Sequence, residues 1–188
     1  NALCFAAERP GSESSPEFQQ LLRRQLPVIS RRLQQTLDKL RRPDEQPLTH
    51  QRAVEWWSDL KRRFAGQGID FAEAGLTGEL EVPAGLFDTV AENLLQNALE
   101  KRTAQPGLRV AVGLSGDAPV ELSVTDSGSA MPPELARRLL RGPVESARGF
   151  GIGLYQAARQ AEAAGYRLEL ANNENGEVCL RLREVQKK

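Results

Sequence analysis

Hydrophobic residues recur at steps of three and four along residues 18–40, which is the spacing of one face of a helix. They are Phe18, Leu22, Leu26, Ile29, Leu33, Leu37 and Leu40, with Pro27 between them. Residues 1–8 have the pattern of a helix end, and the breaker-rich stretch 9–16 predicts a loop between the two helices. The short first helix cannot cover this stripe, so we infer a partner chain; packing on its own domain is the alternative.

The stretch RRPDEQP at 41–47 ends this pattern and predicts a domain boundary, with residues 1–45 before it and 46–188 after it. Beyond it, helical and alternating patterns follow each other. Helices are predicted at 49–66, 84–101, 132–140 and 153–164, and strands at 69–74, 108–114, 120–126, 166–170 and 178–182. These elements predict an α/β two-layer sandwich, in which three helices cover a mixed, mostly antiparallel sheet.

Composition narrows the classes of function. The 25 basic residues balance 25 acidic ones, so net charge gives no argument for nucleic acid as a partner. Two cysteines and one histidine are too few for a disulfide framework or a zinc cluster, which fits a reducing cytoplasm. No apolar run reaches the roughly 18 residues of a membrane span. Because Met131 is the only methionine, we expect the chain to be a piece of a longer polypeptide.

Two asparagines lie beside the hydrophobic face of the helix predicted at 84–101. At helical spacing, Asn97 projects between Leu86 and Val90 on the core side, and Asn93 flanks the same arc. A buried carboxamide without partners costs about 1–3 kcal/mol. The two amides therefore need a ligand, or a backbone partner if Asn97 is a core residue.

Asp126 continues the buried face of the strand predicted at 120–126, after Val120, Leu122 and Val124. A carboxylate at the buried end of a strand needs a donor, and Gly128 allows a flat group to lie close to the backbone. The alternative is that Asp126 caps an ordinary Asp-Ser-Gly turn.

Three glycines, Gly149, Gly151 and Gly153, lead into an alanine-rich helix that Gly165 ends. Bare amides at a helix N-terminus suit a phosphate, because the N–H groups and the helix dipole both favour an anion. The pattern is neither a Walker loop nor a dinucleotide fingerprint. A flexible glycine loop without a ligand is the alternative.

Taken in this order, NLLQNA (93–98), DSGSA (126–130) and GFGIGL (149–154) resemble the N, G1 and G2 boxes of the histidine kinase catalytic domain, one of the ATPases and kinases with the Bergerat fold. The resemblance covers roughly residues 48–185 and implies binding of ATP and Mg²⁺. Ala130 replaces the second glycine of G1, the stretch from G1 to G2 is short, and LLRGPVE lacks the phenylalanines of the usual F box.

The resemblance implies an ATP site made of Asn93, Asn97, Lys101, Asp126, Gly128, Arg148, Gly149, Gly151, Gly153 and Leu154. In this family the N-box asparagines, here Asn93 and Asn97, hold Mg²⁺ and the phosphates, and amide oxygens suit that cation. By the same resemblance Asp126 accepts from the adenine amino group. Lys101 and Arg148 contact phosphates or are surface charges.

The resemblance also bears on the reaction. Related ATPases carry a glutamate as base for water four residues before the magnesium asparagine, where this chain has Asn93. Glu92 points about 100° away on the helix. The missing base favours phosphoryl transfer to a protein over hydrolysis. The alternatives are a degenerate nucleotide-binding or interaction domain, and a serine-directed anti-sigma-type kinase of the same fold.

Residues 1–45 resemble the distal part of a histidine kinase dimerisation hairpin. By this resemblance the acceptor histidine lies upstream of Asn1, outside this chain, and His50 is not the acceptor, so the chain is not expected to phosphorylate itself. The implied partners are ATP, a second copy bound through the hairpin of the full-length protein, and the receiver domain of a response regulator. The expected location is cytoplasmic, whether or not the full-length sensor is membrane-anchored.

Overall fold

The computed structural model describes residues 49–117, 119–142 and 153–185. These residues belong to one compact unit, Pro47–Lys188. The hydrophobic stripe at 18–40 and the predicted dimerisation hairpin lie outside the described residues, so both stay predictions.

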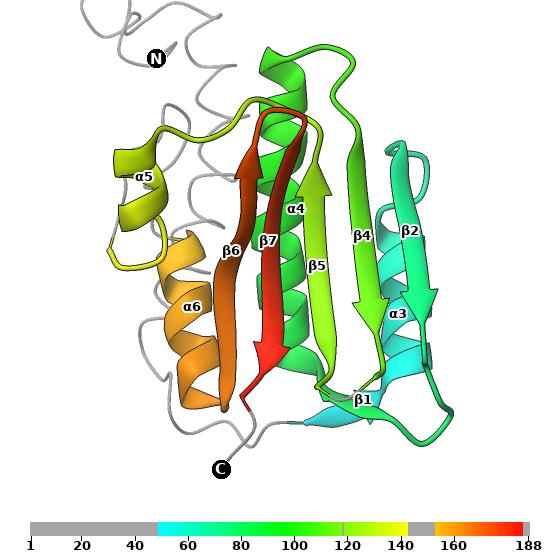
Figure 1. Ribbon diagram of the computed structural model, residues 1–188. Helices are drawn as coiled ribbons and strands as arrows, with labels where there is room; N and C mark the ends of the chain where they lie inside the picture. Colours follow the sequence, from blue (N-terminus) through cyan, green and yellow to red (C-terminus); the bar gives the residue numbers. More distant parts are fainter. Residues whose placement is uncertain (1–48, 118, 143–152, 186–188) are drawn as a thin grey trace, which may run out of the picture. The chain divides into compact units, whose positions relative to one another are not determined.

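The centre of the unit is a five-stranded sheet in the order β2-β4-β5-β7-β6 (Figure 1). Its strands are β2 (Ile69–Ala74), β4 (Val110–Ser115), β5 (Glu121–Asp126), β6 (Tyr166–Glu174) and β7 (Glu177–Glu184). Only β2 and β4 pair in parallel, and the other three pairings are antiparallel. The short strands β1 (His50–Arg52) and β3 (Glu81–Pro83) form a separate antiparallel pair.

Three longer helices lie on one face of this sheet, and a short fourth helix lies beside them (Figure 1). They are α3 (Ala53–Arg63), α4 (Ala84–Ala104), α6 (Gly153–Ala163) and the short α5 (Pro133–Arg138). Of the helices in the described part of the chain, none has a stretch long and apolar enough to cross a membrane. The predicted two-layer α/β sandwich with a mostly antiparallel sheet is thus confirmed.

The core lies between the helices and the sheet because alternate strand residues point to the helices. On β4 and β5, Val112, Leu114 and Leu122 are at most 2% exposed. An aromatic chain joins the layers: Trp56 of α3 meets Phe87 of α4 edge to face at 5.3 Å between ring centroids, and Phe87 meets Tyr166 of β6 at 5.6 Å. Trp57, the other tryptophan of the sequence, packs edge to face on Phe71 of β2.

The first predicted helix begins later than expected. Residues 50–52 form β1, whose His50 pairs with Pro83, so the helix starts at Ala53 instead of Thr49. The closing hairpin is also longer than predicted, because β6 continues to Glu174 and only Asn175 and Gly176 form the turn. Gly176 has a φ of +92°, a conformation that favours glycine.

The prediction that Asn97 projects to the core side of its helix is wrong, because its side chain is exposed. The buried residues of α4 run from Leu86 around the helix to Leu95. At 100° per residue the centre of that arc lies about 70° from Asn97. Asn97 is therefore at the edge of the buried face, and Asn93, on the same edge, is half-buried.

Candidate functional site

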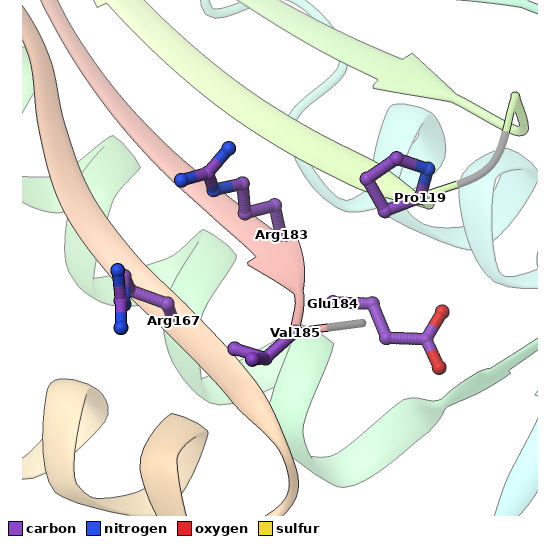
Figure 2. Close-up of a pocket in the computed structure, with 5 residues that line it drawn as sticks. All are labelled: Pro119, Arg167, Arg183, Glu184 and Val185. Carbon is purple, nitrogen blue, oxygen red and sulfur yellow. The ribbon is translucent and has the colours of Figure 1, made fainter. Parts of the chain in front are cut away.

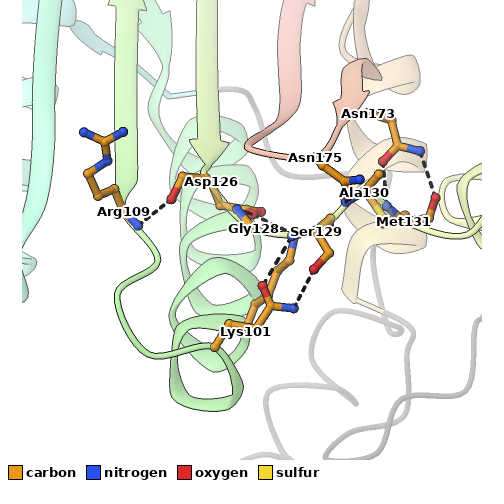
Figure 3. A network of polar contacts seen from close by, with 11 residues as sticks. Lys101, Arg109, Asp126, Gly128, Ser129, Ala130, Met131, Asn173 and Asn175 are labelled. Atoms are coloured by element: carbon orange, nitrogen blue, oxygen red, sulfur yellow. Dashed lines mark hydrogen bonds and ion pairs between the residues drawn. The ribbon is translucent and has the colours of Figure 1, made fainter.

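An ion pair joins the C-terminal half of α4 to the end of β5 (Figure 3). Lys101 Nζ lies 2.7 Å from Asp126 Oδ1 and donates a second hydrogen bond to the Ser129 carbonyl at 2.9 Å. The side chains of Lys101 and Asp126 are only 23% and 11% exposed. Asp126 ends a strand on its helix-facing side, as predicted, and a cation from α4 supplies the donor that this carboxylate needs.

The loop 127–131 that follows Asp126 is tied to its surroundings from two sides (Figure 3). At the C-terminal end of α4, Gln105 Oε1 accepts a hydrogen bond from the Ser129 N–H, and Gln105 Nε2 donates one to the Ser129 hydroxyl. From the β6–β7 hairpin, Asn173 accepts from Met131 N–H at 2.7 Å and donates to its carbonyl at 3.0 Å. Gly176 N–H donates to the Gly128 carbonyl at 2.9 Å. The backbone of this loop is therefore held by hydrogen bonds from the end of α4 and from the β6–β7 hairpin.

Gly128 is closely surrounded by side-chain atoms on the side where a larger residue would have its Cβ. A Cβ built on it would be 2.6 Å from Lys101 Cε, 2.7 Å from Leu108 Cδ1 and 2.8 Å from Asp126 Oδ1. Its own N–H donates to Asp126 Oδ1 at 2.9 Å. The close approach of α4 and the Asp126 carboxylate thus favours glycine here, because a Cβ would displace the ends of three side chains.

Ala130, which replaces a glycine of the G1 pattern, causes no backbone strain. Among the described residues no side-chain-bearing residue has a positive φ. The Ala130 N–H donates to Asn175 Oδ1 at 2.9 Å. The substitution therefore fits a backbone conformation that any residue can adopt.

The second part of the candidate site lies where α4 meets the start of α6. Asn93 donates from Nδ2 to the Thr89 carbonyl at 2.7 Å, and a Cβ built on Gly153 would overlap Asn93 Oδ1. The last glycine of the G2 pattern thus packs directly on the first asparagine of the N pattern. Leu154 is half-buried against the core.

Three predicted site residues, Arg148, Gly149 and Gly151, lie outside the described residues, so their roles stay predictions. Lys101 is described, and its ammonium lies on Asp126; a phosphate contact for it likewise stays a prediction. The structure brings Asn93 to Gly153 and Lys101 to Asp126 and Gly128. Asn97 lies on α4 between these two groups.

Glu92 is held away from these residues. Its Oε1 accepts from Arg63 Nη1 of α3 at 2.9 Å, and Arg63 also pairs with Asp88. These groups are on the α3 side of α4. The prediction that Glu92 points away from Asn93 agrees with this ion pair.

Gln105, Ser129, Asn173 and Asn175 hold the loop after Asp126, yet the sequence alone did not identify them. Asn173 and Asn175 belong to a polar stretch, ANNENGE, that has the composition of an ordinary turn. Their function depends on a contact 42 or 45 residues away in the chain. No local pattern carries that information.

A separate pocket of about 300 Å³ lies at the opposite end of the sheet, lined by Pro119, Arg167, Arg183, Glu184 and Val185 (Figure 2). Arg167 and Arg183 are directly paired across β6 and β7. Arg183 Nε lies 3.3 Å from Glu169. None of the three motif segments contributes to this pocket.

The same sheet face carries a second arginine with carboxylate partners. Arg181 Nη1 donates to Glu121 Oε2 at 3.1 Å, and this hydrogen bond raises the pKa of the Arg181 guanidinium above its ordinary value. Alternating charges of this kind are typical of a solvated sheet face, whereas the polar residues at the other end converge on one loop.

Residues 83–186 match the family described as histidine kinase-, DNA gyrase B-, and HSP90-like ATPases. The chain belongs to this family. It is 34% identical over 183 residues to the sensor protein kinase CarS of Pseudomonas aeruginosa, covering 93% of this chain and 40% of that protein. It is 27% identical over 142 residues to the sensor protein KdpD of Escherichia coli, covering 67% of this chain and 16% of that protein. The chain thus spans less than half the length of these relatives.

Solved structures of family members have the same fold. The catalytic domain of the histidine kinase ThkA superposes with a TM-score of 0.61 at 22% identity, covering 74% of this chain and 96% of that one. The histidine kinase domain of EnvZ from E. coli gives a TM-score of 0.53 at 21% identity, covering 77% and 93%. The resemblance found in the sequence, to the catalytic domain of histidine kinases, is confirmed.

Proposed function

We propose that this chain is the ATP-binding catalytic domain of a sensor histidine kinase, which transfers the γ-phosphate of ATP to a histidine outside the chain. One observation carries the proposal. Asn93, Asn97 and Lys101 follow each other at steps of four along α4, with Gly153 beside the first and Asp126 beside the last. Eight residues of helix span about 12 Å, which is on the order of the length of a nucleoside triphosphate.

In this proposal the base binds at the Asp126 end and the phosphates at the Asn93 end. Asp126 accepts a hydrogen bond from the exocyclic amino group of adenine. The N-terminus of α6 favours the negative phosphates through its terminal N–H groups and dipole. The tied loop 127–131 keeps the base end in place before the nucleotide arrives, so little ordering entropy is lost there on binding.

The residues at the phosphate end fit Mg²⁺. Asn93 Nδ2 donates to the Thr89 carbonyl, and this hydrogen bond leaves Asn93 Oδ1 facing the start of α6. Asn97 is exposed on the same side of α4. Two neutral amide oxygens suit a hard cation that keeps several waters and shares phosphate oxygens. Asn93 and Asn97 would hold the ion, which when bound neutralises phosphate charge.

We expect transfer to a protein over hydrolysis because, in the part of the chain that the structure describes, neither position 93 nor its neighbour Glu92 supplies a free carboxylate base. Asn93 stands where the related ATPases have glutamate, and the neighbouring Glu92 is engaged by Arg63. Without a base, water is a poor nucleophile. An acceptor imidazole instead needs near-attack positioning, about 3–3.5 Å from the phosphorus.

The proposed partners follow from the class of protein. The structure of the histidine kinase ThkA in complex with the response regulator TrrA gives a TM-score of 0.62 at 17% identity, covering 98% of this chain and 56% of that one. We propose that the full-length protein forms a homodimer through its helical hairpin and passes phosphate to a response regulator in the cytoplasm.

The first experiment is a calorimetric titration of the chain with ATP and Mg²⁺. We expect binding, and we expect Asp126→Ala to weaken it by about 1.5–3 kcal/mol, the range for a hydrogen bond to a charged group. Asp70→Ala is the control, because it removes an exposed carboxylate on the edge strand β2. Absence of binding would favour a degenerate interaction domain.

The second experiment incubates this chain, and an extended chain with the upstream helix, with γ-labelled ATP. We expect acid-labile, alkali-stable label only on the extended chain, on a histidine upstream of Asn1. Label on His50 would contradict the acceptor assignment. Acid-stable label on an added serine substrate, or rapid phosphate release without label, would instead favour the serine kinase or the ATPase.

A further inference from the structure

Lys101 is a fixed part of the base end of the site. Its Nζ is held between Asp126 Oδ1 at 2.7 Å and the Ser129 carbonyl at 2.9 Å, and its stem packs on Gly128. Only 23% of the Lys101 side chain is exposed. A surface lysine would have no such fixed position.

The two oxygens of Asp126 have different environments. Oδ1 accepts from both Lys101 Nζ and the Gly128 N–H. Oδ2 has no hydrogen bond to another described residue, although Asp126 is only 11% exposed. This oxygen is not among the buried atoms that lack a partner, so it keeps some access to solvent and can accept one donor from a ligand.

Lys101 also has one N–H without a partner among the described residues. An ammonium group carries three donors, and two of them are used by Asp126 and Ser129. The site therefore presents a donor and an acceptor side by side, the ammonium and the carboxylate. The edge of a 6-aminopurine carries the complementary pair, the donating amino group at C6 next to the accepting ring nitrogen N1.

We propose that Lys101 is a second base-reading residue, whose Nζ donates to N1 of the purine while Asp126 Oδ2 accepts from the C6 amino group. This inference rests on the proposed ATP-binding function. It makes Lys101 a specificity residue for 6-aminopurine nucleotides. A 6-oxopurine is rejected twice, because its O6 acceptor faces the carboxylate and its N1–H donor faces the ammonium.

The test is a titration of wild type and Lys101→Met with ATP and with 1-deaza-ATP, in which N1 is replaced by C–H. Wild type should bind ATP at least about tenfold more tightly than 1-deaza-ATP, the value of one hydrogen bond to a charged group. Lys101→Met should weaken ATP binding by about the same factor and leave 1-deaza-ATP binding within about twofold. The preference for N1 then disappears.

Two variants serve as controls. Lys61→Met removes a lysine from an ion pair with Glu73 on β2, and it should change neither affinity, which controls for the lost positive charge. Lys101→Gln keeps an N–H donor of similar reach and should restore part of the preference for ATP. If Lys101→Met melts well below wild type, the comparison of ATP with 1-deaza-ATP is made on Lys101→Gln instead.

Equal weakening of both nucleotides by Lys101→Met, with no preference regained in Lys101→Gln, would overturn the role of Lys101. Tighter binding of ATP to Lys101→Met would also overturn it, because the lysine would then compete with the base for Asp126. If wild type binds neither nucleotide, the proposed function itself fails.

Discussion

Gly128→Ala tests the packing on which the base end of the site depends. The new Cβ would meet three atoms from three segments of the chain at 2.6–2.8 Å: Lys101 Cε, Leu108 Cδ1 and Asp126 Oδ1. Ordinary carbon contacts are about 3.5–4.0 Å, so each of these groups must move by close to 1 Å. The lysine stem can shift, but the ion pair it forms with Asp126 must then lengthen or rotate.

Overpacking of this kind costs about 1–3 kcal/mol. For a domain of this size the melting temperature should fall by roughly 3–10 °C. Movement of Lys101 and Asp126 should also weaken ATP binding. Overpacking at a position away from the site would lower stability without weakening ATP binding. Calorimetric melting and an ATP titration on the same preparation measure both effects.

Gly85→Ala is the matched control for this prediction. Gly85 lies in the first turn of the same helix α4, and a Cβ built on it meets no atom within 4 Å. Alanine has the higher helix propensity, so we expect unchanged stability or a gain of up to about 1 kcal/mol. If Gly128→Ala melts as high as Gly85→Ala and binds ATP as wild type does, the close packing around Gly128 is refuted.

Three further predictions concern separate parts of the unit. Asn97→Ala should abolish the Mg²⁺ dependence of ATP binding and spare metal-free ADP; equal losses in titrations with and without metal would contradict the metal role. Asn173→Ala should cost about 1–3 kcal/mol in urea unfolding, because it leaves the Met131 N–H without its partner; a change near zero would count against the tie. Burial raises the pKa of Tyr166 to about 12, so the folded chain keeps a proton that the unfolded chain loses above pH 10. Stability should therefore fall between pH 10 and 12 by up to about 1.4 kcal/mol per pH unit, and Tyr166→Phe, compared with wild type by urea unfolding across this range, should remove that part of the loss.

The sequence was sufficient for the fold because its elements carry strong local patterns. The alternation of Val120, Leu122 and Val124 predicts β5, and the helical spacing along 84–101 predicts α4. It was insufficient for β1 and β3, which have three residues each and depend on pairing between His50–Arg52 and Glu81–Pro83. Three residues show no periodicity, so only the tertiary contact reveals them.

The site was predictable to the extent that its residues lie in compact motifs. Asp126, Gly128 and Asn93 were found because each motif is continuous in sequence. The pairing of Lys101 with Asp126 was not predicted, because the two residues are 25 positions apart in the chain. The ammonium contacts the carboxylate only once α4 packs on the sheet. The core position expected for Asn97 failed for a related reason, since the width of the buried arc depends on what covers the helix.

Both tryptophans of the sequence lie next to each other in α3 and are 1% exposed. Their indole N–H groups donate to Asp88 and Glu73, and their rings pack on Phe87 and Phe71, all within Pro47–Lys188. Indole emission excited at the red edge of the absorption band therefore originates in this unit alone. A fluorescence-detected denaturation curve of the whole chain will therefore report the opening of the layer between α3 and the sheet.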